Sequence, residues 1–451
     1  MRAAELGAAR VAIWGLGREG QAAIGFLRAR HPNLPLLLLD DAEDARAPAG
    51  LDGIACAFGT EQIAGALGDI DVIVKSPGVS LYRPEIESAR DNGVEITSLL
   101  NLWFAERVDL TTICVTGTKG KSTTASLIAH MLRKLGRRVA LVGNIGVPIT
   151  ASDPATADYA VIEVSSYQAA DFDGVCDVAV LTSLFPEHLD WHRTLEAYYR
   201  DKLNLLRHSR RAIVNRDAAA IAGAAEFGQL FFNDEDAIHG RGADIFQGPE
   251  RVGGVRNRYL ARAHNISNLC AALTVARALG MNLAAALDRT GDFVALPHRQ
   301  QELGVIGDIL YVDDSISTAP ESTLAALSVY AGHDVTVIVG GHDRGIDYGK
   351  LVAALAQGAA RAVICLGASG ERIYSGLREA AKRSGAAAPA AYQAQSMQDA
   401  VARARQMTSA GGVVLLSPAA PSYGYYRDFA ERGRDFAAKV GRPPDSSEGS
   451  G

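Results

Sequence analysis

The chain has 451 residues, of which 48% are apolar, 21% charged and 6% aromatic, and its formal net charge at pH 7 is −6. A chain of this length exceeds what one hydrophobic core usually supports, so we expect about three domains. The acidic balance argues against nucleic-acid binding, and because no apolar run approaches the roughly 20 residues of a membrane span or forms a signal-peptide core, we expect a cytoplasmic protein without membrane insertion.

Apolar runs of strand length alternate with stretches of helical pattern in the first half of the chain. Such alternation predicts parallel sheets with helices on both faces. The predicted strands are residues 10–14, 36–39, 72–74, 113–115, 139–142, 159–164, 178–181 and 212–214.

A polar, glycine-rich stretch at 234–259 interrupts this alternation, and a predicted helix at 264–279 and a hinge at Leu296-Pro297-His298 follow it. Beyond the hinge, strand patterns at 309–312, 335–339, 362–366 and 413–416 predict another open α/β sheet. We therefore predict an α/β protein of three domains with a short tail. These are a Rossmann-like N-terminal domain (1–97), a central domain with a parallel sheet like that of P-loop ATPases (98–297), a Rossmann-like C-terminal domain with an open α/β sheet (298–440), and a disordered tail (441–451).

The first predicted strand runs into a glycine motif, Gly15-Leu16-Gly17-Arg18-Glu19-Gly20, and Asp40 ends the next strand. This arrangement is typical of a dinucleotide-binding loop, in which glycines allow the turn and the acidic residue binds a ribose hydroxyl. The motif alone is a weak signal, because the same glycines also suit a tight strand-to-helix turn. A nicotinamide-dependent dehydrogenase is one interpretation, although it leaves the second phosphate loop, described next, without a role.

A second phosphate-binding pattern spans residues 112–124, where a short apolar strand leads into a loop with Gly117, Gly120, Lys121 and Ser122 and then a helix. In such a loop, backbone N–H groups surround phosphate oxygens, the lysine neutralises charge and the serine hydroxyl can bind magnesium. The spacing departs from the commonest form, whose first glycine would fall at Val115. The order of strand, loop and helix nevertheless favours a nucleoside-triphosphate enzyme.

Several candidate metal ligands follow this loop. Glu163 lies near the end of a buried strand, where magnesium-nucleotide enzymes place a metal-binding carboxylate. His188 follows the carboxyl end of another strand, a common ligand position in open α/β sheets. His192, four residues later, lacks a third zinc-type ligand nearby, so we expect a surface residue. Lys202 has the default pattern of a helical surface lysine, and its spacing alone indicates no other role.

The cysteines give no sign of a metal or disulfide site. The five residues are widely spaced, and none forms a C-x-x-C pair. Since several lie in apolar runs, we expect buried, reduced thiols. They are Cys56, Cys114, Cys176, Cys270 and Cys365.

Taken together, the ordered motifs resemble the ATP-dependent Mur ligases of peptidoglycan synthesis, and within that family the MurD type. The resemblance extends from the first glycine loop to Phe436. It rests on the phosphate loop at 116–123, Gly143-Asn144-Ile145-Gly146, Glu163-Val164-Ser165-Ser166-Tyr167-Gln168, Glu187-His188-Leu189-Asp190, His264-Asn265, Leu296-Pro297-His298-Arg299 and Asp314-Ser315.

The resemblance implies that the N-terminal domain binds the UDP of a UDP-N-acetylmuramoyl-L-alanine substrate, the central domain binds ATP and the C-terminal domain delivers glutamate. ATP would phosphorylate the alanine carboxylate, and the glutamate amine would attack the acyl phosphate. The resemblance further implies two Mg²⁺ ions and a carbamylated lysine at position 202. We also expect a monomer.

The resemblance assigns roles to individual residues. Lys121, His188 and Lys202 would be catalytic, and the metal-binding set would be Ser122, Glu163, His188 and Lys202. ATP would be bound by Gly117, Thr118, Lys119, Gly120, Lys121, Ser122, Thr123, Asn265, Asn268, Arg299 and Asp314. The UDP-linked substrate would be bound by Gly15, Gly17, Arg18, Glu19, Gly20, Asp40, Ser76, Pro77, Gly78, Asn144 and Ser165. The amino acid would be bound by Thr318, Arg344, Ser422 and Phe429.

The amino-acid site departs from the pattern of ligases that add D-glutamate. Ile316 replaces the usual lysine of Asp-Ser-Lys-Ala-Thr, and Arg344 occupies the position of a carboxylate-binding lysine. Arginine offers a two-pronged donor where lysine offers a point charge, so carboxylate recognition can persist with altered geometry. The pattern is similar to the family branch that adds L-glutamate and is linked to a later glutamate epimerase. The alternatives left open are addition of D-glutamate, with drift at these two positions, and a non-catalytic nucleotide-gated scaffold.

Overall fold

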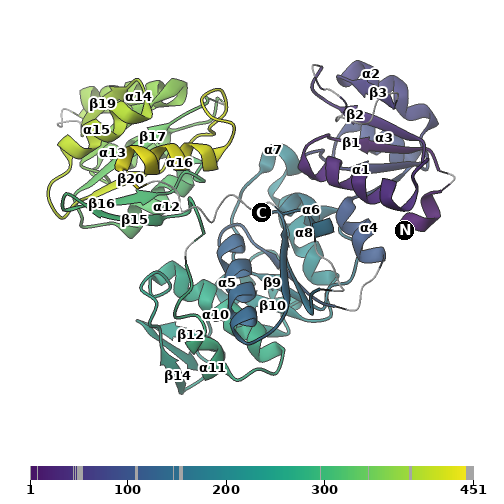
Figure 1. Ribbon diagram of the computed structural model, residues 1–451, viewed down its shortest axis with the longest axis horizontal. Helices are drawn as coiled ribbons and strands as arrows, with labels where there is room; N and C mark the ends of the chain where they lie inside the picture. The colour runs from purple at the N-terminus through teal and green to yellow at the C-terminus, as the bar shows by residue number, and fades with distance from the viewer. Residues whose placement is uncertain are drawn as a thin grey trace. The chain divides into compact units, whose positions relative to one another are not determined.

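The computed structural model describes residues 2–7, 9–43, 45, 47, 54–106, 110–145, 147–151, 156–294, 296–343, 345–384 and 389–442. The chain forms two compact units, Met1–Phe293 and Val294–Gly451. The first unit contains two sheets and the second contains one, and helices cover each of them (Figure 1).

The first sheet is entirely parallel, in the order β3-β2-β1-β4-β5. Its central strands are continuous apolar runs because helices bury both faces. The strands are β1 (Val11–Trp14), β2 (Leu36–Asp40), β3 (Ala55–Phe58), β4 (Val72–Lys75) and β5 (Glu95–Thr97). The helices are η1 (Ala3–Leu6), α1 (Arg18–Arg30), α2 (Thr60–Ala66), η2 (Leu67–Asp69), α3 (Pro84–Asp91) and α4 (Leu99–Ala105).

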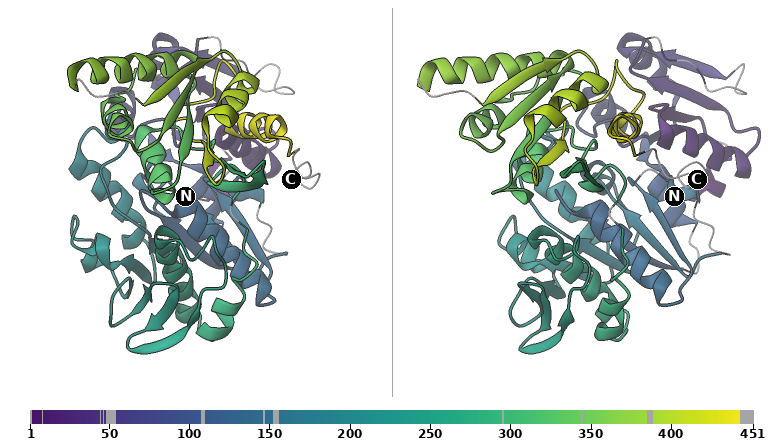
Figure 2. Two further views of the ribbon diagram at one scale, coloured as in Figure 1. Left: turned by 90° about the vertical axis from the view of Figure 1, so that its left-hand side faces the viewer. Right: turned by 60° about the vertical axis from the view of Figure 1, so that its left-hand side comes forward.

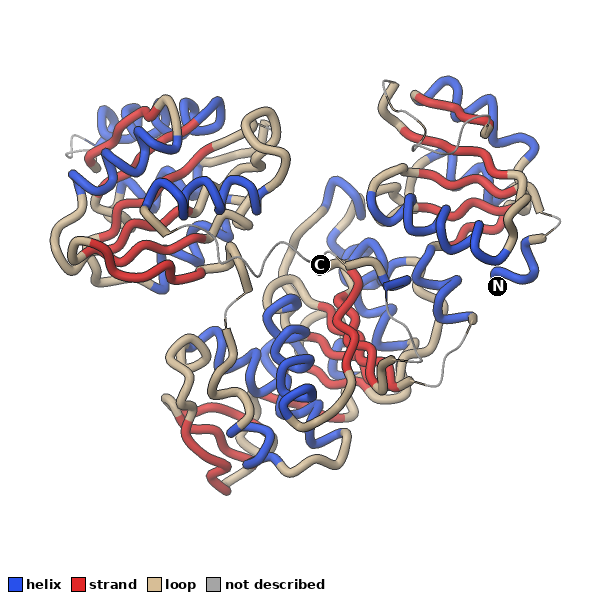
Figure 3. Tube along the Cα trace, viewed as in Figure 1, coloured by secondary structure: helices blue, strands red, loops and turns tan. Residues whose placement is uncertain are grey.

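The second sheet has the order β14-β13-β12-β11-β10-β9-β6-β8-β7. It is parallel from β7 to β12 and ends in an antiparallel meander, β12 to β14. The strands, red in Figure 3, are β6 (Thr111–Thr116), β7 (Val139–Gly143), β8 (Tyr159–Glu163), β9 (Val178–Leu181), β10 (Ala212–Asn215), β11 (Leu230–Phe232), β12 (Ile238–Arg241), β13 (Asp244–Gln247) and β14 (Glu250–Gly254).

Two long helices, α5 (Lys121–Lys134) and α10 (Ala263–Ala278), pack together on one face of this sheet. On the other face, α6 (Ser166–Ala170) and α8 (Leu195–Arg207) belong to the same hydrophobic core as much of the first sheet, which joins the two sheets into one unit. The remaining helices are η3 (Ile149–Ala151), α7 (Leu189–His192), α9 (Arg216–Ala219), η4 (Ala224–Glu226) and α11 (Leu283–Asp288).

The third sheet has the order β15-β16-β20-β17-β18-β19, and only β15 is antiparallel to its neighbour. Helices lie on both faces, as Figure 2 shows. The strands are β15 (Gln301–Ile306), β16 (Ile309–Asp313), β17 (Val335–Gly340), β18 (Ala362–Leu366), β19 (Ala390–Ala394) and β20 (Val413–Leu416). One face packs against α12 (Pro320–Val329), α13 (Gly349–Ala356) and α14 (Gly367–Ser384), and the other against α15 (Met397–Met407) and α16 (Phe429–Val440).

The predicted α/β class with three mainly parallel sheets is confirmed. All the predicted strands occur, with ends shifted by no more than a few residues, and the predicted helix at 264–279 is α10. The domain boundaries at 97 and 297 stay predictions. The expected disordered tail falls largely at 443–451, outside the described residues, while Gly441 caps α16.

Two further expectations can be compared with the structure. All five cysteines are free; four are buried, whereas Cys56 is exposed. None of the helices formed by the described residues combines the length and the apolar character that a membrane span requires.

Candidate functional site: a phosphate loop beside a buried carboxylate

The phosphate loop connects β6 to α5 and has two glycines at positive φ, Gly117 (+147°) and Gly120 (+85°). A Cβ atom on Gly117 would lie 2.0 Å from Thr182 Oγ1, and one on Gly120 would lie 2.4 Å from Asn268 Oδ1. Glycine is therefore required at both positions. The loop leads directly into the N-terminus of α5, whose free N–H groups and dipole favour an anion.

Hydrogen bonds hold this loop against the segment that follows β9. The Thr118 N–H donates to Ser183 O at 2.9 Å, and Thr182 Oγ1 donates to Lys119 O at 2.6 Å. Thr118 Oγ1 also lies 2.7 Å from the hydroxyl of Tyr198 on α8. The loop is thus fixed before any phosphate binds, which lowers the entropic cost of binding.

Two lysine ammonium groups converge on the loop. Lys121 Nζ donates to Gly117 O at 2.9 Å and to Thr118 O at 3.1 Å. Lys202 Nζ, from α8, donates to the same Gly117 O at 2.9 Å. Lys202 is only 1% exposed, so the expectation of a surface lysine is wrong. Burial, together with the nearby Lys121, holds the pKa of Lys202 well below its usual range.

Residues expected to bind the nucleotide also gather at this end of the sheet. Thr124 Oγ1, in the first turn of α5, donates to Asn268 Oδ1 at 3.2 Å. Asn268 Nδ2 donates to Asn265 Oδ1 at 3.1 Å. The start of α10 therefore lies beside the phosphate loop. Lys119 reaches away from this cluster, to Glu187 Oε1 at 2.7 Å.

Glu163 ends β8 directly beside β6, opposite Val115, and is 2% exposed. Asn144 Nδ2 donates to its Oε1 at 2.8 Å, but its buried Oε2 has no hydrogen-bond partner among the described residues. A buried carboxylate oxygen without a partner is costly, and a hard cation such as Mg²⁺ would satisfy it.

The donors near Glu163 fit Mg²⁺ better than a softer metal. Across the described ranges, no group of three or more His, Cys, Asp and Glu side chains lies close enough together to hold a metal ion. Mg²⁺ commonly uses one or two protein oxygens and completes its shell with phosphate and water. Glu163 and the Ser122 hydroxyl at the start of α5 are donors of this kind.

The two histidines after β9 differ in environment. His188 has a positive φ of 57°, packs its ring 5.1 Å from that of Tyr167 and remains partly exposed. Burial lowers the pKa of His188 to about 4, outweighing the opposite effect of Glu187, so the imidazole is neutral at pH 7. His192 is completely buried, and the expectation that it lies on the surface is wrong. It hydrogen-bonds with Asp201 and Ser166.

The first sheet carries the other glycine loop. A Cβ on Gly20 would lie 1.9 Å from Gly15 O, so the turn into α1 can form only with glycine. Ser76 Oγ donates to the same carbonyl at 2.7 Å, and Asp40 Oδ2 accepts the N–H of Leu16 at 2.8 Å. The Asp40 carboxylate therefore holds the backbone of the glycine loop in place. Gly17 is the N-cap of α1, and Arg18 and Glu19 form its first turn.

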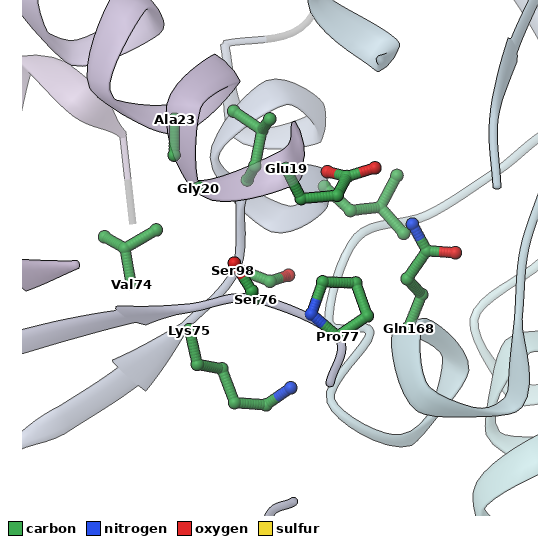
Figure 4. A pocket seen from close by; sticks show the side chains of 11 residues that line it. Glu19, Gly20, Ala23, Val74, Lys75, Ser76, Pro77, Ser98 and Gln168 are labelled. Carbon is green, nitrogen blue, oxygen red and sulfur yellow. The ribbon is translucent and has the colours of Figure 1, made fainter. Parts of the chain in front are cut away.

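A small cavity lies between this loop and α6. Figure 4 shows Ser76 and Pro77, which follow β4, between Glu19 and Gly20 on one side and Gln168 on the other, while the Lys75 side chain points away from Glu19. Ser165, the N-cap of α6, accepts the N–H of Gln168. The carbonyls of Pro77 and Gly78 accept the indole N–H of Trp191. The candidate residues for the UDP-linked substrate thus come from both sheets of the first unit.

In the second unit, Asp314 directly follows β16 and is 2% exposed. It accepts hydroxyl hydrogen bonds from Ser317 at 2.6 Å and Ser417 at 2.8 Å. Burial raises the pKa of Asp314 to about 6 despite these bonds. Thr318 lies on the same loop, and Arg299 precedes β15.

Ser422 lines a cavity of about 360 Å³ at the carboxyl ends of β17, β18 and β20. Phe429 begins α16, and its carbonyl oxygen accepts a hydrogen bond of 2.7 Å from the Ser315 hydroxyl. Sequence reasoning did not identify Arg432, which is buried at the edge of this cavity and donates to Ser315 O at 2.8 Å. Arg344 lies outside the described residues.

Comparison with known protein families agrees with this geometry. A model of the Mur ligase MurD-like N-terminal domain matches residues 9–98, one of the Mur ligase middle domain matches 115–276, and one of the Mur ligase glutamate ligase domain matches 298–420.

Curated relatives match the chain over almost its whole length. A UDP-N-acetylmuramoyl-L-alanine--L-glutamate ligase of Xanthomonas campestris pv. campestris is 42% identical, and the match covers 98% of this chain and 97% of the relative. A protein of the same name from a Micromonospora species is 40% identical, with 98% of each chain covered.

Solved structures share the fold. The UDP-N-acetylmuramate-alanine ligase MurC of Thermotoga maritima aligns with a TM-score of 0.60 at 20% identity, covering 96% of this chain and 99% of the other. The MurF ligase of Thermotoga maritima, solved in complex with ADP, aligns with a TM-score of 0.56 at 16% identity, covering 97% and 96%. With its phosphate loop, its buried carboxylate and these full-length relatives, the chain belongs to the Mur ligase family.

Proposed function

We propose that this protein is an ATP-dependent ligase that joins L-glutamate to UDP-N-acetylmuramoyl-L-alanine during synthesis of the peptidoglycan precursor. The observation that carries the proposal is 42% identity, over nearly the full chain, to a protein named for this reaction. The site chemistry supports it, because two lysines and an unsatisfied buried carboxylate lie around the phosphate loop.

The chemistry explains why such a site is needed. A carboxylate is a poor electrophile, so the alanine carboxylate first attacks the terminal phosphorus of ATP, giving an acyl phosphate and releasing ADP. The amine of glutamate then attacks the acyl carbon and loses a proton, and the phosphate leaves. Both steps depend on positioning and on cations placed in advance rather than on a covalent bond to the protein.

Individual residues fit these steps. We assign Lys121 to the β- and γ-phosphates, because its ammonium already lies over the phosphate loop. Ser122 and Glu163 would hold one Mg²⁺, and His188 with Lys202 would serve a second. When bound, Mg²⁺ supplies charge neutralisation at the phosphates. The low pKa of His188 keeps its imidazole available as a neutral ligand.

The substrates would be divided among the three sheets. We assign the UDP moiety to the loop at 15–20, Asp40 and the loop at 76–78, with Asn144 and Ser165 towards the muramoyl-alanine end. The adenine nucleotide would contact Asn265 and Asn268, with Arg299 and Asp314 contributed by the second unit. Glutamate would be bound by Thr318, Arg344, Ser422 and Phe429. In this assignment the glycine loop of the first domain binds the nucleotide of the substrate. The loop is therefore explained without the nicotinamide cofactor of a dehydrogenase.

The preference for L-glutamate follows the names of the relatives and the residues Ile316 and Arg344. The test measures phosphate release from ATP with UDP-N-acetylmuramoyl-L-alanine and each glutamate enantiomer in turn. Turnover with L-glutamate supports the proposal, turnover with only D-glutamate overturns the stereochemical part, and turnover with neither overturns the ligase assignment and favours a nucleotide-gated scaffold.

The remaining parts of the proposal concern the cellular setting. We propose a monomer that works in the cytoplasm, where ATP and nucleotide-linked precursors are available. If L-glutamate is added, an epimerase that inverts this residue must act on the product. Sedimentation with and without nucleotide tests the monomer, and incubation of the purified product with cell extract, followed by chiral analysis of its glutamate, tests the epimerase.

A further inference from the structure

A chain of hydrogen bonds connects the loop after β4 with α8, and none of its members has a role in the chemistry above. The Tyr82 hydroxyl donates to Asp201, lying 2.6 Å from Oδ2 and 2.8 Å from Oδ1. His192 Nδ1 donates to the same carboxylate at 2.7 Å, and its Nε2 lies 3.0 Å from Ser166 Oγ. Arg200 Nη2 completes the network by donating to the Tyr82 hydroxyl at 2.7 Å.

Ser166, His192 and Asp201 follow the hydrogen-bonding order of a hydrolytic triad, but burial closes them to substrate. Their exposed fractions are 3%, 0% and 5%. Ser166 is also the first residue of α6, fixed in a helix. The three side chains therefore hold α6, α7 and α8 together rather than react.

Trp191, next to His192 on α7, also contacts the loop that follows β4. Its indole N–H donates to Pro77 O at 3.1 Å and lies 3.2 Å from Gly78 O. In the opposite direction, Ser80 Oγ donates to Trp191 O at 2.7 Å. The ring also stacks on Tyr167 at 4.7 Å. The loop at 76–82 is thus attached to α7 and α8 by both backbone and side-chain contacts.

At its other end, the network reaches the phosphate loop. Asp201 and Lys202 are consecutive residues of α8, so their side chains leave the helix about 100° apart. Asp201 faces Tyr82 and His192, while Lys202 donates to Gly117 O. Because α8 is one rigid element, its position fixes both contacts at once.

We propose that Tyr82 and Asp201 are positioning residues that tie the loop holding the UDP-linked substrate to Lys202 and the phosphate loop. The inference rests on the proposed function for the substrate that the loop at 76–78 binds. Binding there would stabilise the Tyr82 contact, and with it the position of α8 at the place where ATP reacts. A rigid element contacted by both sites is a physical route for such coupling.

Tyr82→Phe tests this proposal with little risk to folding, because the ring remains to pack edge-on against Trp191, 6.0 Å away. Burial and the Asp201 carboxylate raise the pKa of Tyr82 to about 12, so the substitution removes a protonated donor at any working pH. We expect kcat to fall roughly tenfold, since a hydrogen bond to a charged acceptor is lost. We expect the KM for glutamate to stay within about twofold, because the second unit binds it.

Amide hydrogen exchange of the full chain without ligands provides a readout independent of activity. Exchange should rise in Tyr82→Phe across α8 and the phosphate loop while remaining unchanged in β10. If the wild-type protein turns over neither glutamate enantiomer, the proposed function fails, and the exchange experiment alone decides the role of the network.

Two control variants distinguish loss of the contact between Tyr82 and Asp201 from a general loss of rigidity in the first unit. Glu87→Ala removes the exposed contact of α3 with Arg193, which does not involve Tyr82 or Asp201, and Tyr159→Phe removes a hydroxyl at the opposite end of β8 from Glu163. Both should leave exchange at the phosphate loop near the wild-type value. The proposal is overturned by unchanged kcat and exchange in Tyr82→Phe, or by an equal response in either control.

Discussion

Lys75 and Asp171 form a buried ion pair between the end of β4 and the end of α6, directly beneath the loop at 76–78. Lys75 Nζ lies 3.1 Å from Asp171 Oδ2, and the two side chains are 1% and 7% exposed. Lys75→Met keeps most of the side-chain volume but leaves the carboxylate buried without its cation. Removing one partner of such a pair typically costs about 3–5 kcal/mol, so we expect that loss of stability in the first unit.

The pH dependence provides a second signature of the same carboxylate. Burial raises the pKa of Asp171, outweighing the attraction of Lys75. A carboxyl whose pKa is higher in the folded than in the unfolded state takes up protons on folding, so its contribution to stability falls as the pH rises through the interval between the two values. Loss of Lys75 raises the folded pKa further and extends this interval upwards. The deficit of Lys75→Met should therefore be largest near about pH 8 and smaller near about pH 5.

Thermal unfolding followed by tryptophan fluorescence measures this effect. At about 2–4 °C per kcal/mol for domains of this size class, the expected loss corresponds to a Tm lowered by roughly 6–20 °C. Adding Asp171→Leu should restore most of the stability, because apolar replacements of a buried pair are often neutral. Lys134→Met is the matched control, since its ion pair with Asp292 is exposed and such pairs contribute at most about 1 kcal/mol. A Tm for Lys75→Met within about 2 °C of wild type at pH 8, or no recovery in the double variant, would refute the reasoning.

Three further substitutions or treatments test the proposed sites. Lys121→Ala should lower kcat by on the order of 10²-fold or more, because the transferring phosphoryl group loses its nearest cation; a wild-type rate in the phosphate-release assay would contradict the ATP site. If Lys202 is carbamylated, enzyme depleted of CO₂ should lose activity and regain it with bicarbonate, whereas an unmodified lysine in a high-resolution map of the active complex would exclude the modification. Gly20→Ala should raise the KM for the UDP-linked substrate and destabilise the first unit, because the new Cβ would lie 1.9 Å from Gly15 O. Gly25→Ala is the control, since this glycine faces open space on the same helix. It should stabilise the first unit by about 0.5–1 kcal/mol, as calorimetry can measure.

The sequence predicted the strands that are marked by apolar runs, including the edge strand β7, and missed most of the other strands at the sheet edges. A central strand such as β17 is a continuous apolar run that stands out in the chain. The edge strands β3 and β19 are short, alanine-rich and largely exposed, so their pattern does not differ from that of a loop. The antiparallel meander from β12 to β14 lies in the glycine-rich stretch, where inward residues such as Ile238 and Ile245 are too few to mark it.

The candidate site shows a related contrast. Features formed by residues close together in the sequence were predictable, and contacts between residues far apart in the sequence were not. The phosphate loop and the first glycine loop could be predicted because strand, turn and helix follow one another within a few residues. The burial of His192 could not, because its partners are Asp201, nine residues later, and Ser166, 26 residues earlier. The packing of α6, α7 and α8 alone brings these side chains together, and the His-Leu-Asp-Trp-His spacing contains no sign of it.

Lys202 shows how such packing changes chemistry as well as location. Its surroundings on α8 would suit a surface lysine, yet the helix is oriented so that the side chain enters the core beside Gly117. Burial disfavours the ammonium form, and Lys121 adds a like charge, so both effects increase the fraction of neutral amine. A neutral amine can attack CO₂, forming a carbamate and releasing one proton, and this exchanges a cation for an anion. Burial disfavours both charged forms, but next to Lys121 the anion is favoured and the cation is not, so the charge of Lys121 both lowers the pKa of Lys202 and would stabilise the product of its modification.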